Sequence, residues 1–503
     1  MKSTISTCIF AMTLLVALAL PVSLAAQERP HGQLKKEHSR YKVIDLGTFG
    51  GPNSFVQEEL QVINSRGTAV GLAETTTPDP YAPNCFDSEC LVAHAFEWQK
   101  GKLTDLGALP GVNNSGANWI SESGLIAGGS ENGTIDPLLG GPEHHAVLWE
   151  KGQIIDLGTL GGGYESTAWT VNSRGQVAGD SLNLVPDPFN PAGTQERTFL
   201  WQDGAMQDLG TLGGPDAGLI GFKGNVEMNE RGQVVACSLT SYNPGPLGVP
   251  PVDPFLWDKE KGMLDLGSLG GTSGCAINLN NRGQVVGYSN LLGDTTTHPF
   301  LWDRGVLTDL GTLGGTFGFA NWVNEEGEAV GAANTKGDQA FHGFIWRKGI
   351  MTDLGTVPGD SCSGAFSINS KGQVVGNSGD CSSNFFDHAF LWEDGGPMVD
   401  LNTLVVPQSG VQLVWAKDIN DHGEIAGLGE LPNGDIHAVL LISCRQGDEC
   451  ENDAAKIRAS IQNHAAFNST VSSQLRPTPN EVLAAWRTRM ARRYHIPVGA
   501  PRD

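Results

Sequence analysis

Short apolar runs alternate with polar turn residues along most of the chain after residue 40. The runs are four to seven residues long, rich in Val, Ile, Phe, Leu and Trp, and bounded by Gly or Asn. Runs of this length are too short for helices and are typical of strands. The hydrophobic pattern therefore predicts an all-β protein.

The pattern is also a repeat. An Asp-Leu-Gly or nearly identical triplet begins at Asp45, Asp105, Asp156, Asp208, Asp265, Asp309, Asp353 and Asp400. Repetition at a period of about 45 to 60 residues indicates units that bury their apolar faces only against one another. The chain is therefore expected to contain eight similar units.

The sequence pattern within each unit predicts a four-stranded antiparallel meander. An Asn-x-x-Gly turn, a Gln-Val-Val-Gly run and a His-Ala-Phe-Leu-Trp run lead back to the Asp-Leu-Gly strand, as in residues 369–401. The turn position is Asn64, Asn172, Asn229, Asn280, Asn324, Asn369 and Asn420, with Ser121 in the second unit. Asn and Gly suit this place because tight hairpin turns need left-handed backbone.

Eight such units predict an eight-bladed β-propeller. The competing repeat fold is a straight solenoid. The last unit reaches Cys444 without an Asp-Leu-Gly strand, and a strand of that kind lies at the other end of the chain, at 41–47. Pairing this N-terminal strand with the last unit would close the circle, whereas a solenoid would leave both edges open.

A His-Ala-Phe triplet occurs at His94 and His388, and partial versions occur at His145, His298, His342 and His437. Repeated in register, this pattern resembles the HAF-repeat proteins over about 400 of the 503 residues. That family is described as extracellular. The resemblance implies a location and no particular mechanism.

The N-terminus has the features of a secretory signal peptide over residues 1–26. Lys2 precedes an apolar core at 9–20, and small residues precede Gln27. The core is too short for a membrane span, and nothing later approaches one. We expect a linker at 27–40, the propeller at 41–443, a disulfide loop and helical tail at 444–503, and a secreted or periplasmic monomer.

Eight cysteines follow the signal segment, an even number that suits an oxidising compartment. Spacing favours the pairs Cys85 with Cys90, Cys362 with Cys381, and Cys444 with Cys450. Cys237 and Cys275 remain, and a pair between adjacent units is one option for them. Zinc is disfavoured because no Cys-x-x-Cys pair or Cys/His cluster occurs.

The net charge of −23, with only 32 basic residues, argues against nucleic acid as a partner. An acidic surface favours solubility and would attract cations or basic partners. Composition does not choose between these roles.

We interpret the recurrent Asp and His as structural, because they recur in unit after unit. The Asp is expected to accept backbone amides at its turn, and the His to act as a hydrogen-bond partner, with Arg197 and Asp253 near the two vacant His positions. A ring of calcium sites lacks the usual Asp/Asn clustering. A quinone, as in eight-bladed quinoprotein dehydrogenases, lacks their adjacent cysteines. We expect no cofactor and no metal.

Loop length varies on one face of the predicted propeller. From the second-strand glycine position to the His position, the first four units have 17 to 23 residues and the later four have 10 to 12. The long loops, 75–92, 131–144, 181–196 and 238–252, offer Tyr81, Phe86, Phe189 and Tyr242 as candidate binding residues. The alternative is that these are tolerated surface insertions. The opposite face, with the Asn-x-x-Gly turns, is expected to be uniform and tight.

Two other features leave alternatives open. Trp119, Trp169, Trp322 and Trp415 on the predicted first strands would pack in the core or line the channel mouth. The basic helix predicted at 479–493 would dock on the acidic propeller, or bind a partner or a membrane surface.

No nucleophile motif, phosphate-binding loop or zinc-helix motif is present in the sequence. We therefore expect a module that binds an extracellular protein or a carbohydrate through the long-loop face. The alternative is a glycan-directed hydrolase or lyase with carboxylates at the channel mouth, since propellers host both enzymes and binders.

Overall fold

The computed structural model describes residues 38–444, apart from 58–59, 83–84, 86–88, 139, 191, 219–225, 383–386, 394 and 406–409. The signal segment, Phe86, Cys450 and the predicted tail helix lie outside the described residues. The described residues from Ser39 to Cys444 belong to one compact unit. Within the described ranges, no helix has the length and apolarity needed to cross a membrane.

The regular secondary structure of the described chain is almost entirely β-strand, arranged mainly in four-stranded antiparallel sheets. Units 1, 2, 3 and 7 each form a separate sheet with their strands in sequence order. These strands are β2 (Gly50–Phe55), β3 (Ala69–Pro78), β4 (Leu91–Gln99) and β5 (Lys102–Gly107); β6 (Ser115–Ile120), β7 (Ile126–Ile135), β8 (Pro142–Glu150) and β9 (Gln153–Gly158); β10 (Ser166–Val171), β11 (Val177–Pro186), β12 (Thr194–Gln202) and β13 (Ala205–Asp208); and β27 (Cys362–Ile368), β28 (Val374–Gly379), β29 (His388–Trp392) and β30 (Val399–Asp400).

Units 4, 5 and 6 join into one thirteen-stranded sheet through single parallel bridges, Val252 to Ser273 and Thr297 to Phe317. Their strands are β14 (Ala217–Gly218), β15 (Glu227–Met228), β16 (Val234–Leu239), β17 (Val252–Asp258) and β18 (Gly262–Asp265); β19 (Gly270–Leu279), β20 (Val285–Leu291), β21 (Thr297–Asp303) and β22 (Val306–Asp309); and β23 (Gly314–Val323), β24 (Ala329–Thr335), β25 (Phe341–Arg347) and β26 (Ile350–Asp353). The short helical turns are η1 (Leu160–Gly162) and η2 (Leu401–Thr403).

Unit 8 takes its fourth strand from the N-terminal end of the chain. Strand β1 (Tyr41–Asp45) pairs antiparallel with β33 (Ile436–Ser443), which continues to β32 (Ile425–Glu430) and β31 (Gln412–Ile419). The register runs from Tyr41 opposite Ser443 to Asp45 opposite Val439. The strand predicted at 41–47 therefore lies in the sheet of the last unit.

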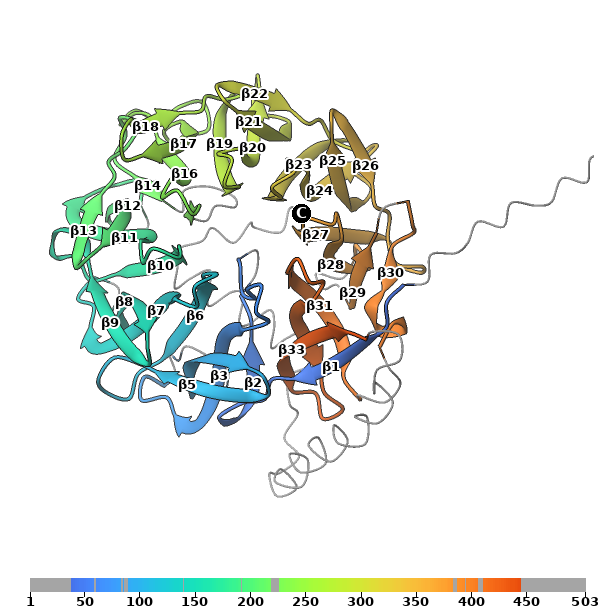
Figure 1. Ribbon diagram of the computed structural model, residues 1–503. Helices are drawn as coiled ribbons and strands as arrows, with labels where there is room; N and C mark the ends of the chain where they lie inside the picture. The colour runs from blue at the N-terminus through green and yellow to red at the C-terminus, as the bar shows by residue number, and fades with distance from the viewer. Residues whose placement is uncertain are drawn as a thin grey trace, which may run out of the picture. The chain divides into compact units, whose positions relative to one another are not determined.

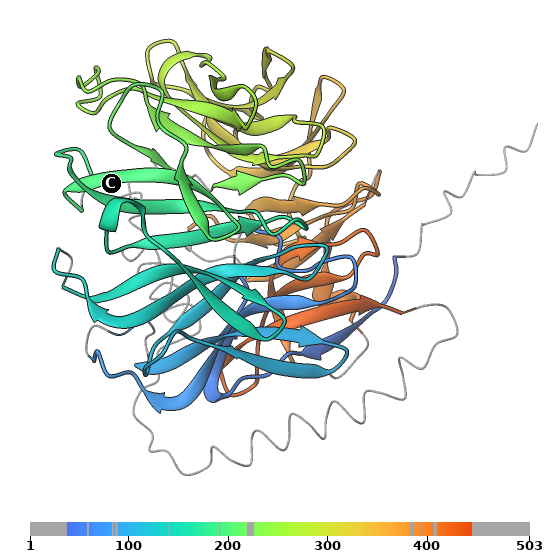
Figure 2. The same cartoon turned by 60° about the vertical axis from the view of Figure 1, so that its left-hand side comes forward.

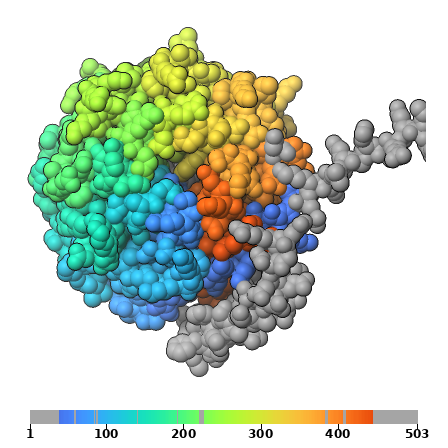
Figure 3. Space-filling model, viewed as in Figure 1, coloured from blue at the N-terminus to red at the C-terminus, as the bar shows by residue number. Residues whose placement is uncertain are grey.

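Successive units lie side by side around a common centre, with the first strand of each unit innermost (Figures 1 and 2). Figure 3 shows that their side chains pack closely around a narrow central hollow. The predicted all-β architecture of four-stranded antiparallel sheets is confirmed, and the arrangement is β-propeller-like.

The phenylalanine of the third strand explains why the second strand carries glycine. Phe96, Phe199 and Phe390 are fully buried in equivalent places. A Cβ at Gly71, Gly179 or Gly376 would lie only 2.8–2.9 Å from the nearest of these ring atoms, and closer still to a first-strand carbonyl oxygen. Each buried aromatic contributes about 2–3 kcal/mol, so the glycine preserves a large packing term.

Disulfides join Cys85 to Cys90, Cys237 to Cys275, and Cys362 to Cys381. The second links β16 of unit 4 to β19 of unit 5, the pairing that spacing alone had left open. The predicted pair between Cys444 and Cys450 lies partly outside the described residues.

Candidate functional site

The long loops of the first three units are largely ordered hairpins. After a bulge, β3, β7 and β11 each regain pairing near their ends, with Pro78 opposite Leu91, Ile135 opposite Pro142, and Pro186 opposite Thr194. An Asp-Pro step then turns the chain: the carboxylate oxygens of Asp79, Asp136 and Asp187 accept the amide two residues on, at 2.6–2.9 Å. The described parts of these segments therefore extend the β-structure of their sheets outward.

The candidate binding aromatics differ in exposure. Tyr242 is 59% exposed, whereas Tyr81 and Phe189 are half-buried beside their Asp-Pro turns. Phe86 lies outside the described residues.

Exposed apolar side chains gather on the long-loop face. Among the described residues, nine of the twelve strongly exposed large apolar side chains lie on its hairpins and connections, in units 2 to 5. They are Val112, Ile135, Leu138, Leu184, Val185, Tyr242, Leu247, Val249 and Leu292. We call these nine residues the apolar lip. Apolar exposure concentrated in one region is typical of interaction surfaces.

The recurrent aspartates cap turns on the same face. In seven units the Asp Oδ1 accepts the amide of a glycine two residues on, at 2.7–2.8 Å. These glycines have φ between 69° and 84°, which a side chain would strain. Asp400 instead caps η2 through the Asn402 amide.

Five histidines pair with the Asp of their own unit through Nδ1, at 2.7–3.1 Å. The pairs are His94 with Asp105, His145 with Asp156, His298 with Asp309, His342 with Asp353, and His437 with Asp45. Burial would raise the pKa of Asp353, but hydrogen bonds from His342 and the Gly355 amide outweigh it and lower this pKa. The same bond raises the pKa of His342.

Three units depart from this pairing. Arg197 replaces the histidine in unit 3 and lies 3.8 Å from Asp208. His388 bonds Asp360 rather than Asp400. In unit 4 Asp253 faces Asp265, and burial together with this second carboxylate raises the pKa of Asp253 to about 6.

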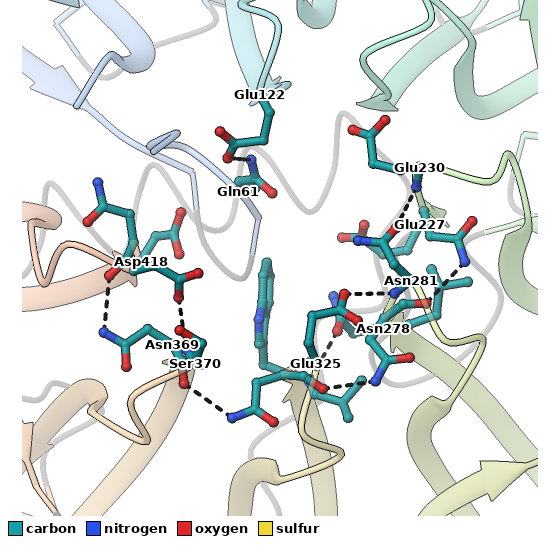
Figure 4. A pocket seen from close by; sticks show the side chains of 18 of the residues that line it. Gln61, Glu122, Glu227, Glu230, Asn278, Asn281, Glu325, Asn369, Ser370 and Asp418 are labelled. Carbon is teal, nitrogen blue, oxygen red and sulfur yellow. Dashed lines mark hydrogen bonds between the residues drawn. The ribbon is translucent and has the colours of Figure 1, made fainter. Parts of the chain in front are cut away.

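A pocket lies in the centre, at the ends of the inner strands where the Asn-x-x-Gly turns occur. About 1020 Å³ of space not filled by protein atoms lies in and immediately around it, open solvent included. Figure 4 shows Glu227 and Asp418 on opposite sides of this pocket, with Glu122 and Glu325 on the other two. The face that we expected to be uniform and tight therefore carries a cavity. Tight turns constrain the backbone there, but side chains decide how much of the centre they fill.

The turn asparagines bond one unit to the next around this pocket. Each Oδ1 accepts amides of its own turn, while Nδ2 reaches the carbonyl oxygen of the turn residue in the following unit. Such bonds run from Asn64 to Ser121 and along the chain of Asn172, Asn229, Asn280, Asn324, Asn369, Asn420 and back to Asn64. Ser121 has no side-chain amide, so it cannot donate the equivalent bond to the Asn172 carbonyl oxygen.

The residues that follow these turn positions alternate between uncharged polar and acidic side chains, and all except Ser173 line the pocket. In chain order they are Ser65, Glu122, Ser173, Glu230, Asn281, Glu325, Ser370 and Asp421. Each acidic member accepts the backbone amide of the member before it, at 2.8–3.2 Å. The exposed carboxylates thus also hold neighbouring units together.

Two carboxyl groups lie deeper. Burial raises the pKa of Asp418 to about 6, against hydrogen bonds from Ser367 and from the amides of Ile63, Val62 and Ile419. Glu227 is 1% exposed, and burial together with the charge of Asp418 raises its pKa well above the ordinary value. Its Oε1 has no hydrogen-bond partner among the described residues.

The first-strand tryptophans separate into two kinds. Trp119 and Trp322 line the pocket and stack on each other, with centroids 6.4 Å apart and planes 20° apart. Trp169 and Trp415 are buried and are not among the pocket-lining residues; Trp169 packs against Asp180 and Trp415 lies beneath the Lys417 ammonium. Both roles considered for this row are therefore present.

Sequence reasoning missed the deep pocket residues, although a signal existed. Two positions before each turn residue the chain reads Val62, Trp119, Thr170, Glu227, Asn278, Trp322, Ser367 and Asp418. A position that varies inside an otherwise regular repeat is not fixed by packing alone. In the described part of the chain, no group of three or more His, Cys, Asp or Glu is arranged to hold a metal ion.

No family model and no curated protein matches the sequence. Solved structures with a similar backbone include Pyrococcus horikoshii acylaminoacyl peptidase (12% identity, 62% of this chain, 50% of that chain, TM-score 0.36), Porphyromonas gingivalis dipeptidyl peptidase 4 (10%, 73%, 57%, 0.40) and TolB from Acinetobacter baumannii (12%, 75%, 80%, 0.29). This chain spans about half the length of the two peptidases. All three TM-scores are low, so these likenesses carry no argument about activity.

Proposed function

We propose that this protein is a secreted or periplasmic binding module, built as a closed eight-bladed propeller, that engages an extracellular protein or carbohydrate through its long-loop face. The apolar lip is the observation that carries the proposal. The resemblance to HAF-repeat proteins stays a prediction and agrees with the extracellular location. The disulfides are compatible with an oxidising compartment.

Contacts between distant units support ring closure. Besides the pairing of β1 with β33, His437 bonds Asp45 and Asn420 bonds the Asn64 carbonyl. Trp119 of unit 2 stacks on Trp322 of unit 6, four units away. In a closed ring of eight units, units four apart lie opposite each other across the centre and can come into contact. In a solenoid each unit contacts only its neighbours.

The form of the long hairpins supports binding. Single exposed apolar side chains are common on protein surfaces, whereas several on one face are typical of interaction surfaces. Here the hairpins are paired and capped up to their tips, yet they expose Ile135, Leu184 and Val185. Because the paired hairpins already hold these side chains in place, binding a partner costs less conformational entropy.

A glycan-directed hydrolase or lyase is the second candidate. The mouth carboxylates and the pair of Glu227 and Asp418 favour it, because glycosidases act through two carboxyl groups. Against it, Asp418 already accepts four hydrogen bonds within the protein, and the mouth carboxylates bind neighbouring amides. We propose binding without chemistry.

The test compares two surface variants of the mature chain. L184S/V185S removes apolar side chains from the lip, and V306S/I350S removes apolar side chains that are even more exposed from the outer strands. Ligands are sought on a glycan array and by affinity capture from extracellular fluid. A ligand lost by the lip variant and kept by the outer-strand variant is the expected result. A ligand that both variants retain would place binding elsewhere, and hydrolysis of a polysaccharide that Glu227→Gln abolishes would establish the enzyme instead.

A further inference from the structure

The charged side chains that line the central pocket are all acidic. Six carboxyl side chains line it, Glu122, Glu227, Glu230, Glu325, Asp418 and Asp421, and no described Lys, Arg or His is among its lining residues. Carboxylates gathered in a concave site focus a negative potential that attracts cations. Amide groups such as those of Gln61 and Asn278 add hydrogen-bonding partners to the lining.

Glu227 is the group that points to a ligand. It is almost completely buried, it faces the pocket, and one of its oxygens has no partner among the described residues (Figure 4). An unsatisfied buried acceptor destabilises the protein, and more so when it is charged. A donor that carried positive charge into the pocket would satisfy this oxygen and favour the ionised form of the carboxyl group, which burial disfavours in the empty pocket.

The aromatic pair narrows the class of cation. Trp119 and Trp322 line the pocket beside the carboxylates. Indole faces attract ammonium groups, and they also pack against an aliphatic stem. A bare divalent ion gains nothing from apolar walls and needs converging oxygen ligands, and the described residues hold no such group of three acidic, His or Cys side chains.

We propose that the central pocket binds a small organic cation with a primary ammonium group on a short aliphatic stem, with the ammonium at Glu227 and the stem against Trp119 and Trp322. This site lies at the ends of the inner strands, away from the apolar lip, so it does not depend on the proposed partner surface. The mouth residues Glu230 and Glu325 provide a further attraction for the cation as it enters.

Isothermal titration of the mature chain with 1,4-diaminobutane at low ionic strength tests the proposal. Saturable binding to one site is expected, weakened at least about tenfold by Glu227→Gln, which keeps the shape and removes the charge. Glu230→Gln at the exposed mouth should weaken binding several-fold without touching the core. Glu150→Gln, on an outer hairpin where the carboxylate bonds Lys151, is the matched control and should bind as the parent does.

Each other outcome overturns the proposal. They are no saturable binding by the parent chain, equal binding by parent and Glu227→Gln, binding of calcium chloride in place of the diamine, and binding of the neutral polyol xylitol with the same affinity as the diamine. Thermal melts of every variant establish that it is folded before titration. If Glu227→Gln does not fold, Glu230→Gln decides, and unchanged affinity in that variant rejects the site.

Discussion

At the scale of single residues, the repeat places one side chain in the same environment many times, and the exceptions are informative. The segments Asp253-Pro254-Phe255-Leu256-Trp257 and His298-Pro299-Phe300-Leu301-Trp302 differ mainly in their first residue. His298 bonds Asp309 at 2.8 Å, whereas Asp253 faces the carboxylate of Asp265. Unit 4 therefore carries a repulsion where unit 5 carries a bond.

Asp253→His should stabilise the protein. It replaces two facing carboxylates by the bonded pair of the other units, for a gain of about 0.5–1 kcal/mol in the free energy of unfolding at pH 7, since the site is partly exposed. His298→Asp is the converse control and should destabilise by a similar amount. Chemical denaturation measures both, and a loss of stability in Asp253→His would contradict this account.

The pH dependence at this site has a defined sign. The pKa of Asp253 is raised to about 6 in the folded protein, so the folded state binds this proton more tightly than the unfolded state. Its contribution to stability is present below the unfolded pKa near 3.9 and is lost as the pH rises through 6. The advantage of Asp253→Asn over the parent should therefore grow between pH 4 and pH 7, and melting temperatures that move in parallel would reject the assignment.

At the scale of elements, the Asn-x-x-Gly turn does two jobs with one side chain. Asn324 accepts the amides of Glu326 and Glu328 and donates to the Asn369 carbonyl of the next unit. The first job follows from local backbone geometry and is predictable from the motif. The second depends on the distance to a neighbouring unit, which the motif does not contain.

Asn324→Ala removes both kinds of bond and should lower the free energy of unfolding by about 2–3 kcal/mol, because it leaves buried backbone groups unpaired. Glu326→Ala changes an exposed residue of the same turn and should stay within about 0.5 kcal/mol of the parent. Urea denaturation of both variants is the measurement. Equal stabilities would show that the bonds between units contribute nothing.

At the scale of the whole molecule, the pairing of β1 with β33 brings the two ends of the described chain together. Leu46 donates to the Ala438 carbonyl, as Leu310 does to the Pro299 carbonyl in unit 5. Ile44 and Thr308 thus occupy equivalent places, in a strand supplied from the far end of the chain and in a strand supplied locally.

Ile44→Pro and Thr308→Pro each remove one donor of a fourth strand and should cost about 3 kcal/mol locally. If β1 closes a ring, Ile44→Pro should cost more, because it also weakens the contacts between units 1 and 8. An unpaired β33 edge would then promote association. Thermal melting and size-exclusion chromatography measure these effects. Equal stability and equal monomer content in the two variants would argue against closure.

The sequence by itself determined what is local. Alternation of apolar runs and turns predicted the strands, the repeat predicted four-stranded units, and the capping of Gly107 by Asp105 is the backbone-satisfying role read from the recurrent Asp. It also placed the N-terminal strand that β33 needs. These features are readable because they depend on residues a few positions apart.

Only the tertiary structure decided which distant side chains meet. Trp119 and Trp322 are far apart along the chain, as are Glu227 and Asp418. No local sequence pattern shows that the members of each pair come near each other at the centre of the molecule. The long loops could likewise not be recognised as hairpins, because bulges interrupt their alternation. Strand periodicity fixes how each backbone folds, whereas the shape of a central pocket depends on side chains that several units contribute at once.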